Sequence, residues 1–209
     1  KPEGGSVSLS LWAWCDADGK ARVRATKVDV DLLDGLLRAD GSFTFLNLEA
    51  REVCEGRLSD LAAGHGLLSR LGLLVDEVRQ GPAPRAEGWA FADLPDAPAG
   101  ARWLRAPLGD GRCELLIAGD RRTVLAKRLL AADGREQIHL AYSRHDTLDG
   151  LYRPTRAVVR LPGDQAPVRV ILRSLDDVPG LRPGTFDLAV PADWKRVEAK
   201  QLLERLEAP

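Results

Sequence analysis

The feature that most constrains this fold is residues 137–190, where strand-like segments and tight turns alternate with no helix-length gap. Residues 138–143 alternate apolar and polar side chains, and residues 155–161, 168–172 and 186–190 have the composition of further strands. Strands joined by such short turns pair antiparallel, because parallel pairing needs a crossover of a dozen or more residues. The back half therefore predicts a large antiparallel sheet, one face of which another element must cover.

The first third of the chain predicts an antiparallel meander as well. Side chains of residues 7–15 alternate strictly between two faces. The odd-numbered residues, from Val7 to Cys15, face one way, and Trp12 and Trp14 face the other. The turn at residues 17–20 returns the chain, and strand-like segments continue to residue 55.

Between these parts lies the clearest helical pattern of the chain. Apolar residues recur at helical spacing over residues 67–78, and residues 58–63 predict a shorter helix before it. Residues 80–100 are rich in Pro, Ala and Gly and predict a loop. A last amphipathic helix is predicted over residues 193–206, with Asp193 as its N-cap.

The predicted fold class is mainly β with helices (α+β). We expect one strongly curved antiparallel sheet of about ten strands with a concave face, because a sheet of that length must curl. A mid-chain helical lid would cover its concave side and leave an apolar interior. The layout of this single domain, residues 1–209, is strands in 6–56, lid in 57–79, loop in 80–100, strands in 101–190 and the C-terminal helix in 193–206.

Composition excludes several classes of function. The 30 basic and 31 acidic residues nearly cancel, so no broad field attracts nucleic acid. The charged fraction of 29% argues against disorder, and no apolar stretch approaches the roughly 20 residues of a spanning helix.

The three cysteines are too few and too scattered for a disulfide framework or a zinc site. Cys15 and Cys54 each end a strand-like run, so a cross-strand pair and buried free thiols are both open, with free thiols favoured. An odd number leaves at least one free thiol in a monomeric chain.

Catalytic patterns are close to absent from the sequence. His139 with Asp146, or His145 with Asp149, could form a dyad, but an alternating strand and a turn place both histidines more simply at the surface. Many aspartates, among them Asp18, Asp40 and Asp110, sit beside glycine, as turn residues do. We therefore expect no enzyme, no catalytic residue, no metal site and no cofactor.

Apolar residues supply the candidate site instead. Trp12 and Trp14 are two residues apart on one strand, so their rings stand side by side and either line a cavity or pack in an ordinary core. The candidate cavity residues come from these strands and from the lid: Trp12, Trp14, Leu36, Phe43, Phe45, Leu68, Leu71, Leu74 and Val75.

The order of segments resembles the LolA/LolB-like superfamily of bacterial periplasmic lipoprotein carriers and outer-membrane lipoproteins. The best match runs from Ile138-His-Leu-Ala-Tyr142 through Leu148-Asp149-Gly150 and Pro154 to Phe186-Asp-Leu-Ala-Val-Pro191. The residues Arg24-Ala25-Thr26-Lys27 resemble an early strand of its outer-membrane members.

The resemblance implies an unclosed barrel with a helical lid, a lipid-sized cavity and a periplasmic location. It also implies an outer-membrane anchor through an N-terminal lipidated cysteine upstream of Lys1. Compared with the family pattern, we expect the N-terminal helix and first strand to be missing from this sequence. Because the chain opens without methionine, we expect it to be a processed or shortened form.

Two functions from different classes follow. The first is a monomeric, non-enzymatic envelope protein that binds a lipid or lipoprotein acyl chains between sheet and lid, with acylated proteins or other envelope proteins as partners. The alternative is a structural or assembly lipoprotein without a ligand, whose helices simply fill the sheet. A pocket converging on His139 or His145 with a carboxylate would revive an enzyme.

Overall fold

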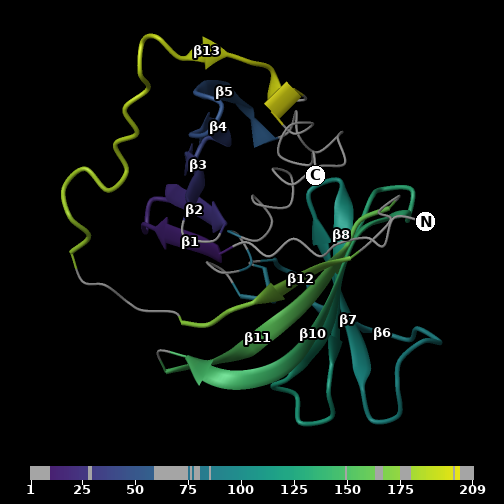
Figure 1. Cartoon of the computed structure of the whole chain (residues 1–209). Coiled ribbons are helices and arrows are strands. Elements are labelled where there is room, and N and C mark those ends of the chain that lie inside the picture. The colour runs from purple at the N-terminus through teal and green to yellow at the C-terminus, as the bar shows by residue number, and fades with distance from the viewer. Residues whose placement is uncertain are drawn as a thin grey trace, which may run out of the picture. The chain divides into compact units, whose positions relative to one another are not determined.

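A computed structural model gives the structure of the chain (Figure 1). The residues it describes are 10–27, 30–58, 75, 77, 81–84, 86–148, 150–162, 167–174, 180–199 and 201–202. The chain forms two compact units: unit 1 combines Lys1–Arg79 with Gly180–Pro209, and unit 2 is the continuous segment Gln80–Pro179. The expectation of one domain over residues 1–209 stays a prediction.

Unit 1 is built on a six-stranded sheet in the order β1-β2-β3-β4-β5-β13. Its first five strands form an antiparallel meander, and β13 pairs with β5 in parallel. The strands are β1 (Ser10–Cys15), β2 (Ala21–Lys27), β3 (Val30–Leu37), β4 (Ser42–Asn47), β5 (Glu52–Arg57) and β13 (Lys195–Arg196).

An apolar cluster of unit 1 lies on one face of this sheet, because alternate residues of its strands are apolar and point the same way. Val23, Leu33 and Phe45 are at most 1% exposed there. Val75, and Val197 and Leu202 from the C-terminal segment, belong to the same buried cluster. Val75 and the C-terminal segment therefore both contribute to this apolar face.

Unit 2 is a seven-stranded antiparallel meander in the order β12-β11-β10-β9-β8-β7-β6. The two longest strands, β10 and β11, bend together as a curved hairpin (Figure 1). The strands are β6 (Ala90–Ala92), β7 (Arg102–Leu108), β8 (Gly111–Ile117), β9 (Val124–Leu130), β10 (Glu136–Leu148), β11 (Leu151–Arg160) and β12 (Val168–Ile171).

The mainly β, antiparallel and unclosed architecture is confirmed, but the single sheet of about ten strands is wrong. The described residues hold thirteen strands in two sheets. In the described residues β13 occupies the outer edge of β5, and the strands of unit 2 pair only with one another.

The C-terminal predictions also need correction. Residues 186–190 form no strand, and residues 193–198 are not helical, so Asp193 is not an N-cap. The amides of Lys195 and Val197 donate to the carbonyls of Arg51 and Val53, and this pairing holds the segment extended. Helical backbone begins only at Ala199.

The predicted lid falls mostly outside the described residues. Leu58, Val75 and Glu77 have helical backbone, but no complete helix is delineated in the described part of the chain. Nor does that part contain a helix long and apolar enough to span a membrane.

Gly35 provides space for an aromatic ring in the core of unit 1. A Cβ atom at Gly35 would lie 2.2 Å from Cδ1 of Phe45, whereas one at Gly56 would lie 3.0 Å from Cζ of Phe43. Neither glycine has a positive φ, so the constraint is steric. The ring of Phe45 thus fills the position of a missing side chain.

We predict that Gly35→Ala lowers the free energy of unfolding by about 2–3 kcal/mol, because the buried ring of Phe45 has no room to move. The matched change Gly56→Ala should cost less than about 1 kcal/mol, since a shift of a few tenths of an ångström relieves it. Urea denaturation of both variants measures the difference. Equal losses would contradict the close packing at Gly35.

Candidate ligand-binding surfaces

The predicted cavity residues lie on both faces of the unit 1 sheet. Trp14 is opposite Arg22, and Arg22 is opposite Leu36, so these side chains share one face. Trp12, two residues from Trp14, shares it too. Phe43 and Phe45 lie on the apolar face, and Leu68, Leu71 and Leu74 lie outside the described residues.

The structure thus brings only part of the candidate set together. Phe43, Phe45 and Val75 are buried in one cluster, and the two phenyl rings lie 4.9 Å apart between centroids. Leu36 is buried on the opposite face, and Trp12 is 58% exposed. Trp12, Trp14 and Leu36 therefore cannot line a space shared with Phe43, Phe45 and Val75. Their assignment to a ligand stays a prediction.

Val75 connects the predicted lid segment with the apolar face. Its side chain is 3% exposed and belongs to the core cluster that contains Phe43 and Phe45. Leu58, at the other end of the segment, packs against the same cluster. Both described ends of the segment thus contact the face that the lid was expected to cover.

The opposite face of this sheet carries a buried ion cluster that sequence analysis missed. Arg22 donates from Nε and Nη2 to the two carboxylate oxygens of Asp34, at 3.0 and 2.7 Å. Arg24 Nη2 donates to Oδ2 of Asp34 at 3.2 Å. Arg22 Nη1 also donates to the carbonyl of Thr185 at 2.9 Å, which ties the C-terminal segment to the sheet.

The electrostatics of Asp34 follow from this arrangement. Burial alone would raise the pKa of its carboxyl, but hydrogen bonds and charge from Arg22 and Arg24 outweigh burial and lower it. The carboxylate therefore stays charged inside the unit, and the cluster acts as a structural clamp.

A row of charged residues crosses the unit 2 sheet. Register places Arg105, Glu114, Arg128, His139 and Arg160 directly opposite one another on five neighbouring strands, β7 to β11. We call these five residues the charged row. Because opposed residues share a face, the whole row projects from one side of the sheet.

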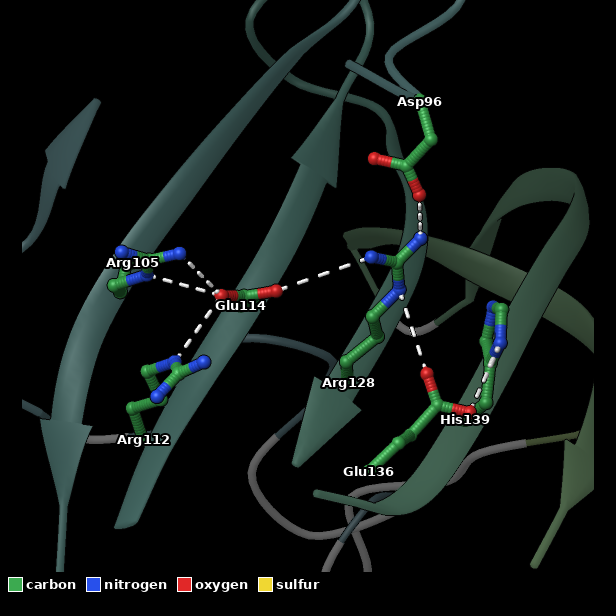
Figure 2. Close-up of polar contacts among 7 residues, drawn as sticks. All are labelled: Asp96, Arg105, Arg112, Glu114, Arg128, Glu136 and His139. Carbon is green, nitrogen blue, oxygen red and sulfur yellow. Dashed lines mark hydrogen bonds and ion pairs between the residues drawn. The ribbon is translucent and has the colours of Figure 1, made fainter. Parts of the chain in front are cut away.

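Glu114 is the buried centre of the charged row (Figure 2). Its side chain is only 3% exposed. Oε1 accepts from Arg105 Nε at 2.9 Å and from Arg112 Nε at 3.3 Å, and Oε2 lies 4.0 Å from Arg128 Nη1. Three guanidiniums thus offset the desolvation of one carboxylate.

Arg128 joins Glu114 to the next charges along the row. Its guanidinium lies over the ring of Trp103, 4.1 Å from the ring centroid, and pairs with Asp96. Its Nε atom lies 3.6 Å from Glu136 Oε2 (Figure 2). Trp103 is 2% exposed, so the cation–π contact is buried beneath the loop that carries Asp96.

The histidines form no catalytic arrangement in the described residues. Burial, opposed by the charge of Glu136, lowers the pKa of His139. His145 uses Nε2 in a 2.9 Å hydrogen bond with the carbonyl of Val124 and stacks on Tyr152. No group of three or more His, Cys, Asp or Glu side chains in this part of the chain could hold a metal ion.

A pocket of about 580 Å³ lies beside β6 in unit 2. Arg105 and Arg112 line it, and Asp93 adds a carboxylate. Small apolar residues such as Ala90 and Ala92 form much of the remaining wall. Since Glu114 already engages both arginines, the pocket offers little uncompensated charge.

The three cysteines are free thiols. Cys54 and Cys113 are buried, and Cys15 is half-buried. Burial raises the pKa of Cys54 to about 11, so this thiol is protonated and unreactive at neutral pH. The pattern of buried free thiols favoured by the sequence is confirmed for Cys54 and Cys113.

Two open, mainly antiparallel sheets define the fold of this β protein. No family model and no curated protein sequence matches the chain. Among solved structures it is similar to a DUF1329 family protein from Desulfovibrio piger, at 15% identity and a TM-score of 0.56, covering 87% of this chain and 82% of that one.

A LolA superfamily protein from Nitrosomonas europaea also matches, at 16% identity and a TM-score of 0.37, covering 81% of this chain and 85% of that one. The likeness to the DUF1329 family protein shows a shared fold alone. No ligand, partner or residue role follows from likenesses this distant.

We predict that Asp34→Asn makes the free energy of unfolding depend less steeply on pH in the acidic range. The folded-state pKa of Asp34 lies below its usual 3.8, so its contribution is present above that value and is lost as pH falls through the folded-state pKa. Urea midpoints of wild type and variant should therefore differ most near neutral pH and converge in acid. Arg22→Gln should reduce this dependence on pH too, and a wild-type slope in Asp34→Asn would contradict the prediction.

We predict that Glu114→Gln lowers the free energy of unfolding by about 2–3 kcal/mol, because partly buried guanidiniums lose their shared anion. Glu136→Gln is the matched control. Its carboxylate is 44% exposed, so the loss should stay below about 1 kcal/mol. Urea denaturation measures both, and equal small effects would show that Glu114 does not hold the charged row together.

Proposed function

We propose that this chain is a non-enzymatic protein of the cell envelope that binds a lipid, or the acyl chains of a lipoprotein, against the apolar face of unit 1. The observation that carries the proposal is the seating of Val75 in the cluster formed by Phe43 and Phe45. This contact supports the proposal because Val75 belongs to the predicted lid segment and lies against an apolar sheet face. The sequence resemblance to periplasmic lipoprotein carriers supports the same class of ligand.

Binding would exchange one apolar contact for another. When no ligand is present, Leu58 and Val75 contact the apolar cluster, and displacement of the segment that carries them would admit an acyl chain. Each buried methylene contributes roughly 0.8 kcal/mol, so a long chain can compensate for the lost lid contacts. No covalent step is required, and release is the reverse of binding.

The proposal includes a location and an oligomeric state. We place the protein in the periplasm, anchored to the outer membrane through a lipidated cysteine upstream of Lys1. There it would act as a monomer that meets acylated proteins or other envelope proteins.

A structural or assembly role without a ligand is the second candidate. Phe43 and Phe45 are at most 1% exposed, so protein side chains already fill this part of the apolar face. In this alternative, the lid segment would be a permanent part of the core.

We predict that Val75→Ala changes the affinity for a fluorescent fatty-acyl probe, because it alters only the contact between lid segment and apolar face. Val53→Ala is the matched control: the same change at a residue that is 1% exposed, on the opposite face of the sheet. Each should cost roughly 2 kcal/mol of stability. Only Val75→Ala should shift probe binding in a fluorescence titration.

Two outcomes of this titration would favour the structural role. Wild type could bind no probe at all, or both variants could bind it as wild type does while remaining folded. Co-purified lipid detected by native mass spectrometry would instead support the ligand-binding role.

A further inference from the structure

The outer strands of unit 2 carry an exposed arginine cluster, formed by Arg156, Arg160 and Arg169. Arg156 and Arg160 lie four residues apart on β11 and so project from the same face. Arg169 on β12 is directly opposite Val158, which lies between them in sequence. Arg169 is therefore the diagonal neighbour of both other arginines.

All three side chains are exposed, and like charges this close repel one another. The cluster extends the face of the charged row, because Arg160 ends that row opposite His139. Among the described residues of β9 to β12, Glu136 is the one carboxylate on this face, and Arg128 pairs with it. The face thus presents guanidiniums to an external anion.

Two large apolar side chains accompany the arginines. Ile171 is opposite Arg156, and Tyr152 lies on β11 at the even positions that also hold Arg156 and Arg160, so both share the face. Ile171 is 58% exposed and Tyr152 is 53% exposed. Arginine beside exposed aromatic and aliphatic residues is the combination that binds the interfacial layer of an anionic bilayer.

We propose that this face of β11 and β12 docks unit 2 onto an anionic lipid bilayer. The guanidiniums contact headgroup phosphates, and Tyr152 and Ile171 insert at the level of the headgroups. An acidic protein surface would explain the arginines, but it gives no reason for Ile171 to be exposed among them. The inference is independent of the lipid site proposed in unit 1, since it rests on another unit and another chemistry.

The test is sedimentation with vesicles of phosphatidylcholine alone or with added phosphatidylglycerol. We expect the wild-type chain to bind only the anionic vesicles and to be released as salt rises. The triple variant Arg156→Gln/Arg160→Gln/Arg169→Gln should lose affinity about 100-fold. The control Arg121→Gln/Arg122→Gln/Arg135→Gln removes the same charge from exposed turns and should bind nearly as wild type does.

A second pair of measurements separates the bilayer from other anions. Ile171→Ser and Tyr152→Ser should each weaken binding to anionic vesicles several-fold while leaving the number of charges unchanged. Circular dichroism verifies that each variant is folded. Inorganic phosphate at millimolar concentration should not displace the protein from vesicles beyond its effect as a salt.

Several outcomes would overturn the proposal. The wild-type chain could bind neutral and anionic vesicles equally, or both triple variants could lose the same affinity. The chain could also bind polyglutamate while binding no vesicles. Failure of the acyl-probe titration leaves it standing, because the probe reports on unit 1. Conversely, the cluster variant should bind the acyl probe as wild type does.

Discussion

The parallel pairing of β13 with β5 is the contact on which the architecture of unit 1 depends. Two backbone hydrogen bonds, from Lys195 and Val197 to Arg51 and Val53, fix the C-terminal segment along the outer edge of β5. They bring Val197 and Leu202 into the apolar cluster, and so the chain's end completes the core begun by β1 to β5. The same pairing ends the first sheet on the side of β5.

Both units place carboxylates inside a sheet protein by the same physical means. Asp34 lies between Arg22 and Arg24, and Glu114 is surrounded by the guanidiniums of Arg105, Arg112 and Arg128. Removing a carboxylate from water is costly unless opposite charge and hydrogen bonds replace the solvent. The arginines supply both the opposite charge and the hydrogen bonds, so each carboxylate can stay buried and charged.

Strand periodicity predicted much of the fold but little of the site. The alternation around Ala13 and Cys15 placed these residues on the buried face, where they are found. Periodicity assigns a side chain to a face without saying what covers that face, so Glu114 could not be distinguished from a solvated charge. The helix predicted around Lys195 was wrong for another reason. Long-range pairing with β5 overrides the helical pattern of this segment.

The discontinuity of unit 1 bears on the order in which the molecule can fold. Arg196 pairs with Glu55 across 141 residues, and the whole of unit 2 lies within that interval. Closing so long a loop has a large entropic cost while the intervening chain is unfolded. Prior collapse of the contiguous meander Gln80–Pro179, whose neighbouring strands are also neighbours in sequence, shortens the effective loop. Unit 2 is therefore expected to fold first. Because synthesis runs from the N-terminus, the first sheet is completed only after the segment that carries β13 has been made.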